Sequence, residues 1–137
     1  TFPTENKAVG INNNFSGTTV VDNCLIKNSG GFDHEWDWRA SVEICVDRRS
    51  ISGLEIKNIN IENSLSNGIS VIAKNVQDEI GVLSNTSLEN ITVLNYGIGV
   101  KDKHALFISS GAQGSLTIKN SAIPEIKNES DSFKIVQ

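Results

Sequence analysis

The chain has 137 residues, of which 38% are apolar and 6% aromatic, and its formal net charge is −4 at pH 7. This size allows one domain with a buried core. The negative charge and the scattered lysines and arginines argue against nucleic acid and anionic membrane surfaces as partners. No apolar run approaches the roughly 18 residues of a membrane-spanning helix.

The first 16 residues are the least regular part of the chain. Pro3 and the asparagines at positions 12–14 disfavour a long element, and only residues 8–11 are expected to form a short strand. The chain begins at Thr1 and contains no Met. It is therefore expected to be a processed product or a piece of a longer protein rather than a native translation start.

One pattern then occurs four times, at intervals of about 30 to 35 residues, in residues 19–29, 54–64, 86–96 and 116–125. Aligning the copies gives columns of like residues, namely Val21, Ile56, Leu88 and Ile118; Asn23, Asn58, Asn90 and Asn120; and Ile26, Ile61, Val93 and Ile123. A further column of Asn28, Asn63 and Asn95 fails in the last copy, where Glu125 stands.

The spacing within each copy predicts strands. Apolar residues lie two apart, shift register at the first Asn and then resume, which is typical of two strands joined by a bend. Asn suits a bend because it tolerates left-handed backbone angles. Stacked copies would let the Asn amides bond to one another, with Asn90 inside the molecule.

Further strands are expected between the copies, at residues 41–46, 69–72 and 105–108, with a last strand at 133–136. Each copy then carries about three short strands and three turns. We expect an all-β fold, a right-handed parallel β-helix of about four to five coils, occupying residues 1–137 as a single domain. No amphipathic helix covers its N-terminal end, so we expect the C-terminal portion of a longer β-helix.

The segment 30–39 interrupts the repeat and concentrates the residues suited to chemistry. It holds both tryptophans, whose faces can stack on sugar rings, so Trp36 and Trp38 are candidate substrate-binding residues, together with His34 and Glu43. Glycoside hydrolysis needs two carboxyl groups, and the weak catalytic candidates are Asp33, Glu35 and Asp37. Alternatively, the segment is a solvated acidic loop whose tryptophans pack on the adjacent strands.

No metal or cofactor is expected. His34 and His104 lie far apart in sequence, each without a second close histidine, whereas zinc needs three or four converging ligands. No Asp-rich calcium loop and no Gly-x-Ser-x-Gly motif is present. Cys24 falls in the column of Ile59 and Ile91, so it is expected to be a small buried hydrophobe and, with Cys45, a free thiol.

Several of these segments resemble one known family. They are residues 36–46, Ile51-Ser-Gly-Leu-Glu-Ile-Lys-Asn-Ile-Asn-Ile, Ser66-Asn-Gly-Ile-Ser-Val, Ser87-Leu-Glu-Asn-Ile-Thr-Val and Gly111-Ala-Gln-Gly-Ser-Leu-Thr-Ile-Lys-Asn. In this order they resemble the last coils of the α-1,3-glucanases, also called mycodextranases or mutanases, which are β-helical glycoside hydrolases. The likeness runs from about residue 16 onward. The family's adjacent aspartates are absent, because no Asp-Asp pair occurs in this chain.

The resemblance implies part of a secreted enzyme that degrades α-1,3-linked glucan. This chain would supply the later coils and one wall of the sugar cleft, with the main catalytic carboxylates upstream and the rest of the parent chain as a partner. Two alternatives stay open. One is a non-catalytic carbohydrate-binding β-helix, and the other is a structural solenoid segment of a phage tail or adhesin.

Overall fold

The computed structural model describes residues 7–11, 17–30, 37–47, 49–73, 81–98 and 100–137. Its strands, in chain order, are β1 (Val9–Ile11), β2 (Thr19–Lys27), β3 (Ala40–Cys45), β4 (Ile51–Ser52), β5 (Leu54–Glu62), β6 (Asn67–Ile72), β7 (Val82–Ser84), β8 (Ser87–Leu94), β9 (Leu106–Ile108), β10 (Gln113–Lys119), β11 (Ile126–Asn128) and β12 (Phe133–Val136). Within these ranges, no helix is long and apolar enough to cross a membrane.

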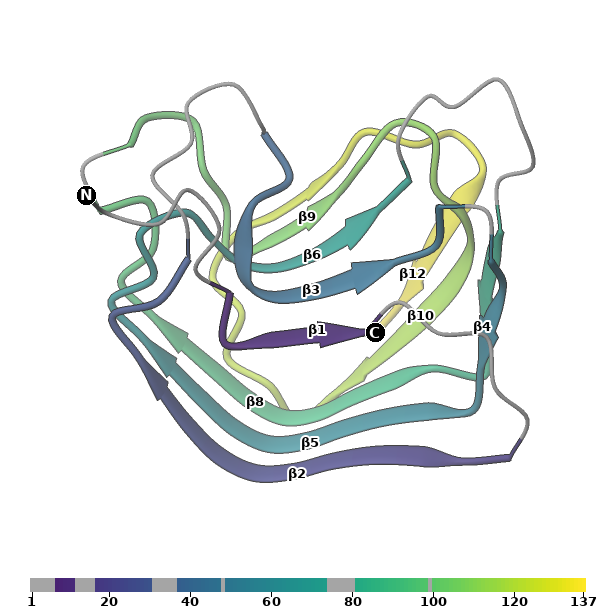
Figure 1. Ribbon diagram of the computed structural model, residues 1–137, viewed down its shortest axis with the longest axis horizontal. Helices are drawn as coiled ribbons and strands as arrows, with labels where there is room; N and C mark the ends of the chain where they lie inside the picture. Colours follow the sequence, from purple (N-terminus) through teal and green to yellow (C-terminus); the bar gives the residue numbers. More distant parts are fainter. Residues whose placement is uncertain (1–6, 12–16, 31–36, 48, 74–80, 99) are drawn as a thin grey trace.

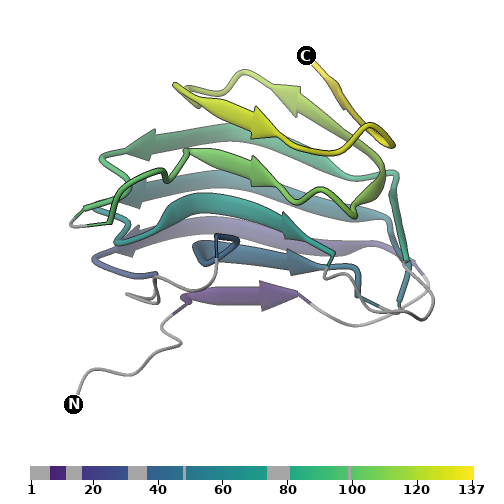
Figure 2. The same ribbon diagram turned by 90° about the horizontal axis from the view of Figure 1, so that it is seen from above.

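The strands form two parallel sheets. The first has five strands in the order β1-β3-β6-β9-β11. The second has seven strands, with the order β2-β5-β8-β10-β7-β4 and with β12 paired to β10. Figure 1 shows the long strands β2, β5 and β8 curving beneath the five-stranded sheet, and Figure 2 shows successive strands lying one above another. The fold is therefore all-β and parallel.

The prediction of a right-handed parallel β-helix of four to five coils is wrong. The strands do not divide into an even series of three-strand coils, because β10 pairs with β8 over Thr117–Lys119 and with β7 at Gln113 and Gly114. This strand joins two rows of strands into one sheet, which curls into a half-barrel. The sequence pattern suggested a break at each Asn, whereas β2, β5 and β8 each run through the bend as one curved strand.

The bends are made by asparagines in the left-handed region. Asn23, Asn58, Asn90 and Asn120 have φ angles of 57°, 55°, 54° and 48°. The second column does the same, since Asn28, Asn63 and Asn95 have φ angles of 52°, 55° and 59°. A single left-handed residue turns the strand while ladder pairs continue on both sides, as between Asp22 and Lys57 before the bend and Cys24 and Ile59 after it.

The Asn column lies on the outside of the bend, which corrects the expectation that Asn90 is interior. Asn90 and Asn58 are exposed, and Asn90 donates its side-chain N–H to Asn58 Oδ1 at 2.8 Å. Asn58 in turn donates to the carboxylate of Asp22 at 2.8 Å. At the first copy, this side-chain hydrogen bond therefore goes to Asp22, the residue before Asn23. The charged column beside it alternates in sign through Asp22, Lys57, Glu89 and Lys119, an order that favours the observed register.

The apolar columns form the core, as predicted. Ile56 and Leu88 are paired in register and almost fully buried, at 1% and 0% exposure, and Ile118 and Val21 pack with them. The column that contains Ile26, Ile61 and Val93 lies in the same core. Cys24 pairs in register with Ile59 and packs against the core, but it is half-buried rather than buried as expected. Both cysteines are free thiols, as expected.

The central strands of the five-stranded sheet are buried on both faces. All six residues of β6 are buried, as are five of the six in β3. An added Cβ at Gly68 would lie 2.6 Å from the carbonyl oxygen of Ala105. The start of β6 therefore lies close against the backbone that precedes β9. Because these strands are parallel, the segments that lead into β3, β6, β9 and β11 lie side by side along one end of this sheet, which we call the corner.

Replacing Asn58 with Leu should lower the free energy of unfolding by about 1–2 kcal/mol, because a branched side chain disfavours φ near +55° and two side-chain hydrogen bonds are lost. Asn58→Gly should lower it less, because Gly adopts this angle freely. Urea unfolding of the two variants measures the difference. Equal losses would show that the backbone angle is not the main constraint.

Candidate functional site

Three of the predicted site residues lie in the described part of the chain. These are Asp37, Trp38 and Glu43, whereas Asp33, His34, Glu35 and Trp36 lie outside the described residues. Asp37 is exposed, Trp38 is half-buried, and Glu43 is buried on β3. The catalytic and substrate-binding roles of all seven stay predictions.

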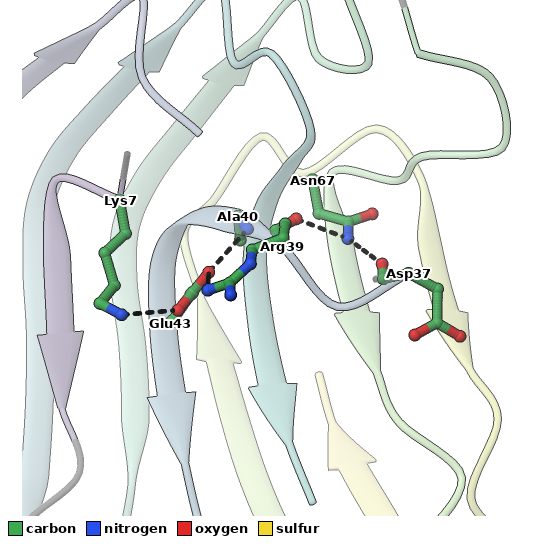
Figure 3. Close-up of polar contacts among 6 residues, drawn as sticks. All are labelled: Lys7, Asp37, Arg39, Ala40, Glu43 and Asn67. Atoms are coloured by element: carbon green, nitrogen blue, oxygen red, sulfur yellow. Dashed lines mark hydrogen bonds and ion pairs between the residues drawn. The ribbon is translucent and has the colours of Figure 1, made fainter. Parts of the chain in front are cut away.

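Glu43 is the centre of a buried ion-pair network. Its carboxylate lies 3.6 Å from the Arg39 guanidinium and 3.3 Å from the Lys7 ammonium, and it accepts the N–H of Ala40 at 3.3 Å. The side chains of Glu43 and Arg39 are only 6% and 9% exposed. Figure 3 shows these groups converging on the Glu43 carboxylate, an arrangement that favours a structural role for this residue.

Asn67 connects residues 37–39, called the Trp38 segment, to the segment that carries His104. Its side-chain N–H group donates to the carbonyl oxygens of Asp37 at 2.6 Å and Arg39 at 2.9 Å. Its Oδ1 accepts the backbone N–H of His104 at 2.7 Å. One fully buried amide therefore joins residues 37–39 to the segment that carries His104, and Figure 3 shows the Asp37 carboxylate pointing away from these contacts.

A chain of buried hydroxyl groups supports the same corner. Ser29 donates to Ser41 and Ser41 donates to Ser64, each at 2.8 Å, and Ser64 donates to the carbonyl oxygen of Asn67 at 2.6 Å. These serines come from segments that follow β2 and β5 and from β3. Because each hydroxyl has a partner, the network holds the Asn67 backbone without leaving a buried polar group unsatisfied at these positions.

Tyr96, His104 and Glu125 meet at this corner, and the sequence reasoning missed them as a group. The Tyr96 hydroxyl donates to Glu125 Oε2 at 2.7 Å, and His104 Nδ1 lies 2.9 Å from Glu125 Oε1. The imidazole also stacks on Phe107, with ring centroids 6.0 Å apart. The sequence did show that Glu125 stands where the earlier copies have Asn. It did not show that Tyr96 and His104 contact this carboxylate.

The Glu125 carboxylate is held in its ionised form. Hydrogen bonds from Tyr96 and from His104 lower its pKa below the ordinary value, and donating its hydrogen bond to Glu125 raises the pKa of the Tyr96 hydroxyl. Glu125 is half exposed, with its side chain at 50%, and the His104 side chain is 18% exposed. The group therefore presents to solvent a fixed anionic acceptor between two aromatic rings.

The described ranges hold no group of three or more His, Cys, Asp or Glu residues that could bind a metal ion. Comparisons with protein-family models, curated proteins and solved structures gave no match for this chain.

Replacing Glu43 with Ala should destabilise the protein by about 3–5 kcal/mol, because it removes a buried carboxylate that pairs with both the Arg39 guanidinium and the Lys7 ammonium. The double variant Arg39→Met, Glu43→Leu removes both charges and should recover most of the loss. Chemical unfolding of the single and double variants tests this. If Glu43→Ala unfolds like the wild type, the buried network does not contribute to stability.

The Tyr96–Glu125–His104 group should make stability depend on pH. The lowered pKa of Glu125 stabilises the fold above its ordinary value of 4.5, and this contribution is lost as the pH falls through the folded-state pKa. The raised pKa of Tyr96 stabilises the fold below 10.0, and this contribution is lost as the pH rises through the folded-state pKa. The Tm difference between the wild type and Glu125→Gln should therefore be largest between these limits.

The exposed Glu129 provides the control for this pH series. Glu129→Gln should melt like the wild type throughout, since no side-chain contact of the described structure depends on its charge. A Glu125→Gln difference that is constant from acid to alkaline pH would contradict the titration argument.

Proposed function

We propose that this chain binds a polysaccharide at the corner formed by residues 37–39, Tyr96, His104 and Glu125. The observation that carries the proposal is the double attachment of Asn67, which holds the Trp38 segment beside His104 and its partner Glu125. Sugar sites combine a flat apolar surface with a few fixed polar groups, and this corner offers both kinds of side chain.

The electrostatics favour binding over acid catalysis at Glu125. A glycosidase needs one carboxyl group with a raised pKa to protonate the leaving oxygen. Hydrogen bonds lower the pKa of Glu125, so its carboxylate suits the acceptance of sugar hydroxyl groups. Glu43 is engaged by Arg39 and Lys7 and is less suited to contact substrate.

The sequence resemblance supplies the proposed ligand and context. By likeness to the α-1,3-glucanases, we take the ligand to be α-1,3-linked glucan and the chain to be part of a secreted glycoside hydrolase, with the hydrolytic carboxylates outside the residues described. The motifs around residues 36–46, 51–61 and 87–93 carry this likeness.

The test is co-sedimentation of the protein with insoluble α-1,3-glucan, with cellulose and starch as comparison polysaccharides. If the exposed part of the Trp38 ring stacks on a sugar, Trp38→Ala should weaken the free energy of binding to α-1,3-glucan by about 1–2 kcal/mol. Thermal melting of the same variant shows whether the ring is instead core packing, in which case the loss appears as about 3–5 kcal/mol of stability.

Leu25→Ser is the matched control for this binding test. Leu25 lies on β2 with 59% exposure, so its replacement removes an exposed apolar side chain from another part of the surface. It should bind glucan like the wild type. The proposal fails if the wild type is not retained by α-1,3-glucan, or if Trp38→Ala lowers stability and leaves retention unchanged.

A further inference from the structure

An apolar groove lies beside the Tyr96–Glu125–His104 group. It has a volume of about 350 Å³ and is lined by Val93, Leu94, Ser121, Ala122, Ile123 and Pro124. This volume falls at the small end of the range for ligand pockets, about 300–1,000 Å³. Pro124 is followed directly by Glu125, and Leu94 lies two residues before Tyr96, so the groove and the polar group share their chain segments.

The groove exists because the β8–β10 pairing ends early. Beyond β10, Ala122 forms an isolated bridge with Thr92, and its N–H bonds to the Ile91 carbonyl oxygen at 2.8 Å. The next donor in the ladder would be residue 124, two positions further on. Pro124 has no N–H to donate, so the ladder cannot continue to this residue. Leu94 takes an outward-facing position on β8, in register with Glu62 of β5, and is 52% exposed.

The same departure creates the polar group. In the earlier copies this corner is turned by Asn63 and Asn95 in the left-handed region, with Asn95 donating to Asn63 Oδ1 at 3.2 Å. Glu125 replaces the Asn in the last copy, and its carboxylate reaches across to Tyr96 and His104. The one copy that breaks the repeat therefore opens an apolar surface and places an oriented anion at its end.

We infer that this groove, together with Glu125 and His104, is a subsite for one or two neutral sugar units of a glucan chain. The apolar C–H face of a sugar ring would lie on Leu94 and Pro124, and a hydroxyl group would donate to a free lone pair of the Glu125 carboxylate. The inference rests on the proposed polysaccharide-binding function and deepens it.

The charge of this corner selects the class of sugar. Glu125 accepts its two hydrogen bonds while remaining half exposed, and the exposed Asp37 carboxylate belongs to the same corner. Like charges disfavour each other on binding, so chains of uronic acids should bind less well than neutral glucans. We therefore infer a neutral glucose oligomer as the ligand.

Isothermal titration of the folded protein with a soluble α-1,3-linked glucose oligomer tests the subsite, with a galacturonate oligomer as the anionic comparison. Glu125→Gln should weaken binding of the glucose oligomer about tenfold or more, because a hydrogen bond to a charged acceptor is lost. Leu94→Asp should weaken it to a similar degree by placing a charge in the groove. Melting curves confirm that each variant is folded.

Leu25→Asp is the matched control, since it makes the same change at a similarly exposed leucine on β2, outside the groove. It should bind like the wild type. The inference is overturned if Glu125→Gln and Leu94→Asp bind normally while Trp38→Ala weakens binding, a result that leaves the proposed function intact. Stronger binding of the galacturonate oligomer overturns the ligand class, and a wild type that binds no glucan overturns the inference and the proposed function together.

Discussion

The left-handed asparagine at each bend is the constraint on which the rest of this structure depends. With φ between 48° and 57° in the first column, the chain turns within one residue while its neighbours remain paired in register. An ordinary residue would resist this angle, and a longer turn would interrupt the ladder. Because each copy turns at the same position, Ile56, Leu88 and their column partners face one interior.

The proposed binding site lies at the one corner where the last copy departs from the regular stacking of the earlier copies. In the first three copies the second corner is an Asn that repeats its neighbour's geometry, as Asn63 and Asn95 show. The last copy replaces that corner with Pro124 and Glu125, which end the ladder and recruit Tyr96 and His104. The groove and the oriented carboxylate thus come from one local change, and the buried Asn67 connects them to the Trp38 segment.

The two carboxylates Glu43 and Glu125 have distinct physical roles. Glu43 has its charge offset by Arg39 and Lys7 within a covered network, and its removal would take away the carboxylate that both cations share. Glu125 is held by a phenol and an imidazole and stays half exposed, so it keeps acceptor capacity for a ligand. Of the segment 30–39, the described residues Asp37 and Trp38 belong to this corner.

The sequence by itself determined the longer strands, the apolar columns and the bends, because a strand's period of two and the backbone preference of Asn are local properties. It did not predict the short strand β11 (Ile126–Asn128). It could not determine that β10 would join two rows of strands into one curled sheet, since ladder continuity across a bend depends on the neighbouring backbone. Nor could it show that Asn90 faces outward, or that Glu125 meets partners 29 and 21 residues away. Only the tertiary structure decided these contacts, because stacking brings together corners that the chain separates by a whole repeat.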